Sequence, residues 1–80
     1  MLTKFIQAAI RRAKYEIVSD DGSFYGHIPE LQGVWANASN LEECREELAE
    51  VLETWLLFRL SKQLPIPALD GIELTTQVVA

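Results

Sequence analysis

The 80-residue sequence has very little of the chemistry from which most catalytic and metal sites are built. It contains one cysteine, Cys44, and one histidine, His27, so it offers neither an internal disulfide nor a zinc site of Cys and His ligands. It also has no glycine-rich phosphate loop and no Ser/His/Asp arrangement. These absences argue against an enzyme, a bound metal and any other cofactor.

Long hydrophobic runs are missing as well. The longest is the run Trp55–Phe58, whereas about 20 apolar residues are needed to span a bilayer, so no membrane insertion is expected. Lys4, Arg11 and Arg12 interrupt the apolar residues near the N-terminus, which is not the pattern of a secretory signal peptide. Together with the single cysteine, this predicts a cytoplasmic protein, and the length predicts one domain over residues 1–80.

Lysine and arginine are absent between residues 15 and 44, and the charge distribution is correspondingly uneven. Residues 1–14 hold four bases and no acid, a charge of +4, while the rest of the chain holds three bases and twelve acids, a charge of −9. An acidic body repels a phosphate backbone, so we expect no direct binding of DNA or RNA. It suits a basic protein partner instead, and the alternative is a charged surface that only keeps the protein soluble.

The first half of the chain reads as one helix followed by short strands. Apolar residues recur at helical spacing from Phe5 to Ala13, which predicts a helix over about residues 3–13. Three later segments have the composition of strands, joined by turns at Asp21-Gly22 and at Pro29–Gly33. Gly26 marks a bulge or the close approach of a neighbour. The strand segments of this predicted antiparallel meander are Tyr15–Val18, Phe24–Ile28 and Val34–Asn37.

The second half is dominated by one long helix. Asn40 or Ser39 can cap its start, because each has a glutamate three residues on, and Pro65 stops it after about Gln63. A fourth strand is predicted over Ile72–Thr75, so we expect an α+β fold of the order α-β-β-β-α-β. The apolar stripe that should pack the helix on the sheet consists of Leu41, Cys44, Leu48, Val51, Leu52, Trp55 and Leu56.

The residues that could carry chemistry lack partners. His27 shares a strand face with Tyr25 but has no evident ligand cluster, so an exposed or interface histidine is favoured over a catalytic base or a metal ligand. Cys44 occupies an apolar helix position and is expected to pack in the core. Tyr25 and Trp35 lie on neighbouring strands without the cations that nucleic-acid stacking needs, which favours protein contact or core packing.

Apolar residues near the end of the long helix exceed what one small sheet can cover. Leu57, Phe58 and Leu60 widen the apolar surface beyond a single stripe. A second chain is a common way to cover such a surface in a small domain. We therefore expect a homo-oligomer, in its simplest form a dimer, with these three residues in the contact.

The ordered set of motifs resembles the HicB-like antitoxin family over about residues 15–74. Asn40 replaces the Ser or Thr usual in that family, and a helix precedes the first strand. Thirteen residues follow Pro67, too few for the helix-turn-helix that many relatives carry, so operator binding is not expected. The segments that carry the resemblance are Tyr15–Val18, Asp21–Gly26, Ile28–Val34, Asn40–Cys44 and Pro65–Pro67.

The resemblance implies a fold like part of ribonuclease H, without its catalytic carboxylates, and a function as an antitoxin. The implied partner is a HicA-type toxin, a small basic protein that cleaves mRNA. The alternatives are an interaction module with the same fold and no toxin, and a hydrolase that uses His27. From charge and expected exposure, the predicted partner-binding residues are Tyr25, His27, Glu30, Trp35, Glu43, Glu46, Glu47 and Glu50.

Overall fold

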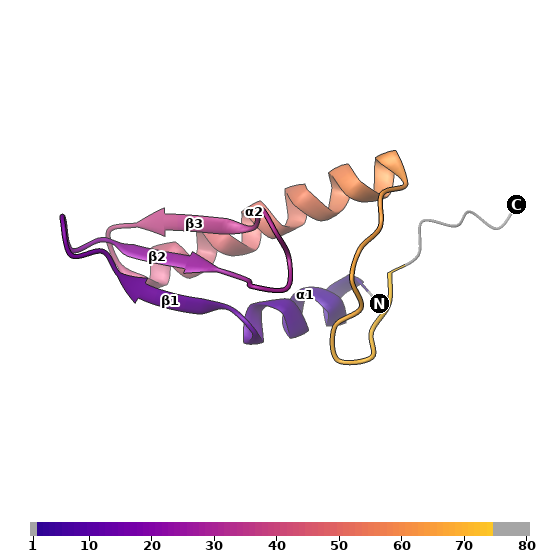
Figure 1. Ribbon diagram of the computed structural model, residues 1–80, viewed down its shortest axis with the longest axis horizontal. Helices are drawn as coiled ribbons and strands as arrows, with labels where there is room; N and C mark the ends of the chain where they lie inside the picture. The colour runs from indigo at the N-terminus through magenta and orange to yellow at the C-terminus, as the bar shows by residue number, and fades with distance from the viewer. Residues whose placement is uncertain (1, 75–80) are drawn as a thin grey trace, which may run out of the picture.

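The structure, a computed structural model, describes residues 2–74 and contains two helices and three strands within them (Figure 1). The strands pair antiparallel in the order β1-β2-β3, so β1 and β3 are both edge strands. The predicted α+β class, the three-stranded meander and the long helix are confirmed. In chain order the elements are α1 (Leu2–Arg11), β1 (Lys14–Ile17), β2 (Phe24–His27), β3 (Trp35–Ala38) and α2 (Leu41–Lys62).

Helix α1 ends two residues before its predicted end. Beyond Arg11, the amides of Arg12 and Ala13 donate to the carbonyls three residues back, at 3.0 and 3.1 Å. The helix therefore tightens into a last turn of the 3₁₀ type, which continues the helical spacing of apolar residues as far as Ala13. The fully buried residues of α1 are Phe5, Ala8 and Ala9.

The turn between β1 and β2 forms where the Asp-Gly pair predicts it. The Val18 amide donates to the Ser23 carbonyl and the Gly22 amide donates to the Val18 carbonyl, both at 2.8 Å. Gly22 has a φ of +73°, which glycine adopts without strain. Hydrogen bonds from the hydroxyl and the amide of Ser23 hold the pKa of Asp21 below its ordinary value. The turn is thus fixed by its own residues.

The turn between β2 and β3 contributes to the core as well as reversing the chain. Ile28, Leu31 and Val34 are all buried, with at most 2% of each residue exposed. The Leu31 amide donates to the Ile28 carbonyl at 3.0 Å, and the Val34 amide donates to the Leu31 carbonyl at 3.2 Å. These two hydrogen bonds, each between residues three positions apart, therefore direct three apolar side chains into the same core, between the sheet and α2.

Helix α2 begins at a cap that the sequence predicts and ends where the sequence predicts its end. Asn40 is the N-cap, because its Oδ1 atom accepts the Glu43 amide at 2.8 Å. The Glu43 carboxylate accepts the Ser39 hydroxyl at 3.4 Å. At the other end Gln63 adopts a left-handed conformation, with a φ of 56°, and the Leu64 amide donates to the Arg59 carbonyl at 2.9 Å. The predicted helix end near Gln63 is confirmed.

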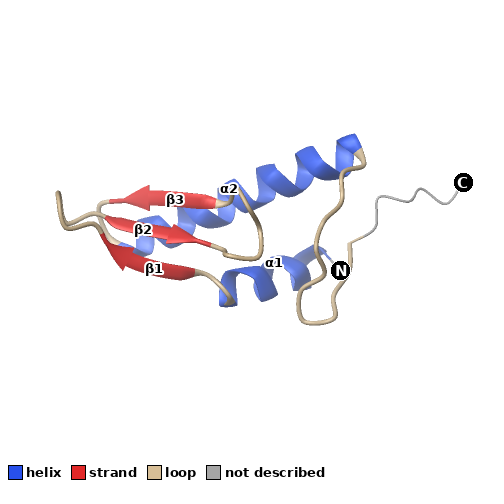
Figure 2. Ribbon diagram, viewed as in Figure 1, coloured by secondary structure: helices blue, strands red, loops and turns tan. Residues whose placement is uncertain are grey.

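The sheet and α2 form two layers, and α2 extends well beyond the strands (Figure 2). Its buried stripe is Cys44, Leu48, Leu52 and Leu56, which faces the sheet and the β2–β3 turn. Helix α1 lies beside the half of α2 that projects past the sheet. The core is therefore continuous from the sheet to the projecting half of α2, and the other face of the sheet carries no layer of the described residues.

Gly26 lies in close contact with a side chain of the neighbouring strand β1 and with one of helix α2. A Cβ atom at this position would lie 2.8 Å from two ring carbons of Tyr15 and 3.1 Å from the Sγ atom of Cys44. Both distances are too short for ordinary van der Waals contact. The expectation of a close neighbour at this glycine is confirmed, and the Tyr15 ring is the principal neighbour.

The segment after α2 folds back over the core. Leu69 is buried, and it exchanges both backbone hydrogen bonds with Ile72, at 3.1 and 2.7 Å. Asp70 and Gly71, which lie between these two residues, both have positive φ, as a two-residue hairpin turn requires. Of the predicted strand Ile72–Thr75, Ile72 forms this single β-bridge, and Thr75 lies outside the described residues.

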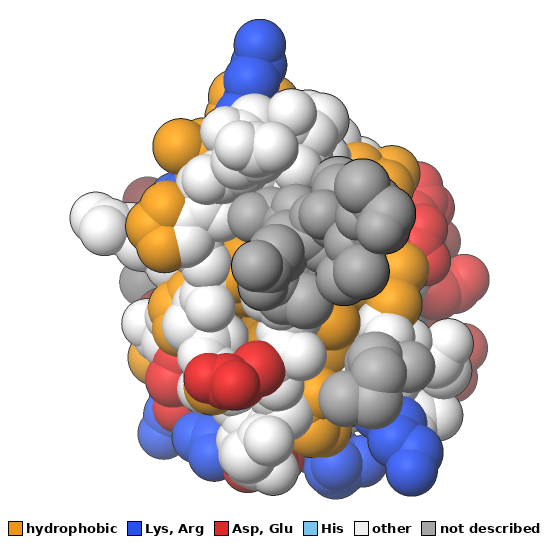
Figure 3. Space-filling model, turned by 90° about the vertical axis from the view of Figure 1, so that its right-hand side faces the viewer, with side chains coloured by type: hydrophobic (Ala, Val, Ile, Leu, Met, Phe, Trp, Pro, Cys, Tyr) orange, Lys and Arg blue, Asp and Glu red, His pale blue; other side chains and the backbone are white. Residues whose placement is uncertain are grey.

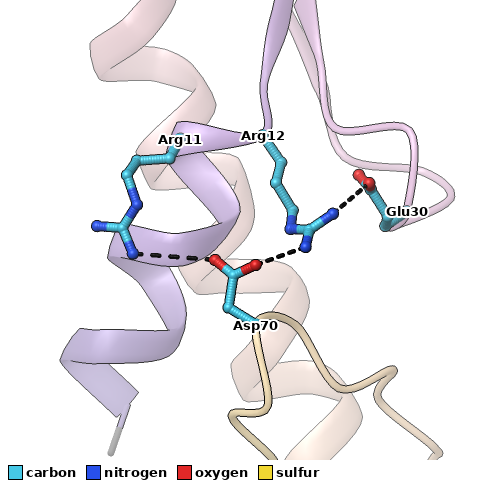
Figure 4. Close-up of polar contacts among 4 residues, drawn as sticks. All are labelled: Arg11, Arg12, Glu30 and Asp70. Carbon is cyan, nitrogen blue, oxygen red and sulfur yellow. Dashed lines mark hydrogen bonds and ion pairs between the residues drawn. The ribbon is translucent and has the colours of Figure 1, made fainter.

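Arg12 joins three distant parts of the chain at the surface (Figure 4). It follows α1, and its guanidinium donates to Glu30 of the β2–β3 turn at 2.8 Å and to Asp70 of the C-terminal turn. Arg11 lies 3.9 Å from the other oxygen of Asp70. The hydrogen bond to Asp70, followed by that to Glu30, raises the pKa of Arg12. The charge cluster thus fastens the C-terminal turn to α1.

Replacing Gly26 with alanine is expected to destabilise the protein by about 1–3 kcal/mol, because the added methyl group overlaps the Tyr15 ring. Urea unfolding followed by circular dichroism measures the change. The matched comparison is the same substitution in a Tyr15→Ala background, where the ring is gone and the added cost should shrink. Equal costs in the two backgrounds would contradict the assigned contact.

The ion pair of Glu30 is expected to make stability depend on pH. A hydrogen bond from its own amide, followed by the bond from Arg12, holds the pKa of Glu30 below its ordinary value of 4.5. Because the folded-state pKa is the lower one, the stabilisation is complete above pH 4.5 and is lost as pH falls through the folded-state value. Glu30→Gln should therefore lower the urea midpoint at pH 7 and have a smaller effect at about pH 2. The control is Glu73→Gln, an exposed carboxylate outside the cluster, and a pH-independent effect of Glu30→Gln would refute the assignment.

Candidate partner-binding surfaces

The open face of the sheet gathers the aromatic residues that the sequence singled out. In the strand register His27 lies opposite Trp35, and Tyr25 lies between Glu16 and Asn37. Neighbouring Gly26 points to the buried side, so Tyr25 and His27 point away from α2. The three rings therefore share the face that none of the described residues covers as a layer.

The rings of this face form one group. The Tyr25 and His27 ring centres are 5.4 Å apart with an angle of 27° between planes, a stacked arrangement. The Tyr25 and Trp35 ring centres are 6.1 Å apart at 30°. Trp35 is 54% exposed, and the group borders a hollow of about 390 Å³ that continues over Pro29. We call Tyr25, His27 and Trp35 the aromatic face. These side chains form a preformed group of aromatic rings with polar atoms at their edges.

His27 is half-buried and lies among few polar groups. Its ring is half-buried against Tyr25, and its Nδ1 atom is buried with no hydrogen-bond partner among residues 2–74. Lys14 lies opposite it on β1. Within the same described residues, no three or more His, Cys, Asp or Glu side chains are grouped closely enough to hold a metal ion.

The acidic residues of α2 lie in the other layer. Because Cys44, Leu48 and Leu52 face the sheet, the glutamates project from the sides and back of the helix, where all are exposed. Figure 3, which views the end of the molecule toward which α2 projects, shows acidic side chains along one flank and hydrophobic side chains at the surface beside them. The acidic residues predicted to contact a partner therefore do not join the aromatic face into one surface. They are Glu43, Glu46, Glu47 and Glu50.

Glu30, also predicted as a contact residue, belongs to the charge cluster. Its carboxylate accepts a hydrogen bond from Arg12 while about two fifths of its side chain stays exposed. It also borders a second hollow, of about 390 Å³, with Trp55 and Pro65. Its first role in the fold is to hold the β2–β3 turn against α1.

The three residues predicted for an oligomer contact do not share one face. Leu57 is 62% exposed and borders a hollow between α2 and α1 that Leu2 and Ile6 also line. Phe58 is 56% exposed and borders a different hollow on α2. Leu60 is half-buried. Consecutive helix residues are turned by about 100°, so Leu57 and Phe58 point in different directions.

Cys44 is buried, as predicted, and packs between the layers. Its Sγ atom lies 3.7 Å from the Ala36 carbonyl oxygen. Burial, followed by the charge of Glu47, raises the pKa of the thiol. A thiol kept protonated in the interior behaves as a small apolar side chain.

Sequence reasoning missed the residues that act over long distances. Arg12 and Asp70 meet although 58 positions separate them, and no local pattern connects them. The contact of Arg59 with Trp55 was also missed, although the sequence carries a signal for it, since the two residues are four positions apart on one helix. Arg59 lies over the Trp55 ring, 4.6 Å from its centre. The Trp55 indole also donates to the Gln32 carbonyl at 3.2 Å, which ties α2 to the β2–β3 turn.

None of the described helices is both long and apolar enough to cross a bilayer.

The molecule is a small α+β protein whose two layers leave one sheet face open. A model of the UPF0150-like family matches residues 4–67, and the chain belongs to this family. A crystal structure of the protein TTHA0281 from Thermus thermophilus is similar, with 40% sequence identity, a TM-score of 0.84, and coverage of 91% of this chain and 90% of that one. Among curated proteins, none matches this chain.

Proposed function

We propose that the protein is the non-enzymatic antitoxin of a toxin–antitoxin pair and that it neutralises a small, basic, mRNA-cleaving toxin of the HicA type. Membership of the UPF0150-like family and the ordered motifs that resemble HicB-like antitoxins support the proposal. The structural observation that carries it is the aromatic face, in which the exposed Trp35 and the half-buried Tyr25 and His27 group on the uncovered side of the sheet. Tyrosine and tryptophan are among the residues most enriched in energetically dominant interface contacts.

In this proposal the aromatic face makes the principal contact with the toxin. Trp35 offers a half-exposed indole, and stacking on Tyr25 restricts the conformations of His27. Side chains that are already ordered lose less conformational entropy on binding than mobile ones. The hollow over Pro29, beside the rings, gives an apolar side chain of the toxin a place to insert.

The acidic residues of α2 act at longer range in this proposal. Within residues 2–74, the three ion pairs all use Arg11 or Arg12 with Glu30 or Asp70, so the α2 glutamates keep their charge uncompensated by such pairs. With a net charge of −5, the chain attracts a basic partner and repels RNA. Electrostatic attraction of this kind raises the rate of encounter more than the final affinity.

A second candidate is an interaction module of the same family that binds another protein and has no toxin. The same aromatic face supports it, because an exposed group of rings does not by itself specify the partner. Both candidates place the protein in the cytoplasm and assign it no reaction. They differ in whether a small basic toxin is encoded beside the gene.

The test is co-expression with any short reading frame next to the gene that encodes a small basic protein. We expect rescue of growth and a complex on gel filtration. Trp35→Ala should weaken toxin binding by at least about tenfold, because it removes the most exposed ring of the face. Isothermal titration calorimetry measures the dissociation constant.

The control for this experiment is Ile17→Ala. Ile17 is 66% exposed and pairs with Phe24, so it lies on the same sheet but on the side opposite the aromatic face. Its truncation should leave binding within about twofold. The absence of both growth rescue and a complex would overturn the antitoxin proposal. Capture of a different protein, in a way that depends on Trp35, would support the second candidate.

A further inference from the structure

The side of α2 that faces away from α1 combines exposed acidic, basic and apolar residues with the half-buried Val51. They recur at steps of three and four, so they line one side of the helix. A hollow of about 580 Å³ lies at the centre of this side, lined by apolar atoms of Val51, Trp55 and Phe58 together with Thr54. We call this surface the distal side, and it consists of Glu47, Glu50, Val51, Thr54, Phe58 and Lys62.

Acidic and basic residues occupy opposite ends of the distal side. Its acids, Glu47 and Glu50, precede the apolar centre, and its base, Lys62, follows it, with Arg59 close by on the same helix. A copy of the same helix running in the opposite direction therefore presents bases to these acids and acids to these bases. The surface is complementary to itself in antiparallel orientation only, since a parallel copy would set like charges side by side.

We propose that a second copy of this chain docks on the distal side, α2 against α2, about a two-fold axis between the positions of Thr54 and Trp55. In this register Glu47 faces Lys62 of the second copy, and Val51 faces its Phe58. Each phenyl ring thus enters the hollow of the other chain. A two-fold interface requires such reciprocal pairing, in which the contact of one residue with another is made twice.

The shape of the surface fits this arrangement. Thr54 is small, so the helix axes can approach to the roughly 8–10 Å of packed helices at the crossing point. Phe58 is 56% exposed, and a phenyl ring is among the side chains that gain most from burial. Arg59 is held over the Trp55 ring and donates to the Pro65 carbonyl at 3.4 Å, so Lys62 is the freer of the two bases.

The dimer leaves the aromatic face and the hollow between α2 and α1 accessible. The aromatic face lies on the far side of the sheet, and Leu57 faces the hollow beside α1. Because one helix supplies the contact, the buried area falls at the low end for specific interfaces, and we expect a dissociation constant in the micromolar range. The inference is independent of the proposed toxin, because its test uses this protein alone.

Analytical ultracentrifugation of the full chain tests the proposal. The wild-type protein should dimerise at micromolar concentration, and Glu47→Lys or Lys62→Glu alone should weaken dimerisation by about tenfold, since each sets like charges opposite each other twice. The double variant restores opposite charges at both positions, so its dissociation constant should return to within about threefold of the wild-type value. Phe58→Ser should abolish the dimer over the same range.

Two controls fix the interpretation. Leu57→Ser removes an equally exposed apolar residue from the other side of α2 and should leave the dimer intact. Circular dichroism melting shows whether each variant is folded, and Phe58→Ser is expected to fold because its side chain is mostly in water. A monomer at 100 µM (about a hundred times a micromolar dissociation constant), failure of the double variant to restore association, or disruption by Leu57→Ser in place of Phe58→Ser would overturn the proposal.

Discussion

The burial of one stripe of α2 determines nearly everything else in this structure. Three strands of four residues each cannot form a stable sheet by themselves, and α2 supplies the apolar side chains that cover their inner face. Burying each leucine of the stripe contributes about 1.5–3 kcal/mol, which is substantial against a total stability of about 5–15 kcal/mol. Since neighbouring strand residues point to opposite faces, covering the side of Gly26 and Ala36 places Tyr25, His27 and Trp35 on the uncovered side.

The length of α2 sets the second constraint. The helix has 22 residues and the strands have four, so its second half extends past the sheet and needs another cover. The chain supplies it from several short pieces: α1, the β2–β3 turn with Leu31, and the returning segment with Leu69. Arg12 fastens these pieces together at the surface through Glu30 and Asp70. The side of α2 around Phe58 stays uncovered by the described residues, and it is the one to which we assign a second copy.

The sequence specified the elements better than the contacts between them. The meander, its turns and the capped helix follow from local chemistry, such as Asp21-Gly22 and Asn40, and their bounds differ from expectation by one or two residues. The burial of Leu31 was not predicted, because turn residues are ordinarily exposed. This turn residue has to be apolar because it packs in the core beside α2, and no local sequence pattern reveals that contact. Leu57 and Phe58 were assigned to one contact because both are apolar residues outside the buried stripe, although a helix directs neighbouring residues to different sides.

The aromatic face, the other glutamates of α2 and the distal side are separate surfaces. The negative charge of α2 can therefore serve two contacts. In the proposed dimer the charge of Glu47 is compensated by Lys62 of the second copy. The other glutamates of α2 keep their charge and, in the proposed function, attract a basic partner; they are Glu42, Glu43, Glu46, Glu50 and Glu53. Each dimer then carries two aromatic faces. Two linked sites retain a partner that can engage both far longer than one site does, even when each contact is modest. A small domain with weak self-association thereby gains a way to hold its partner tightly without a larger interface.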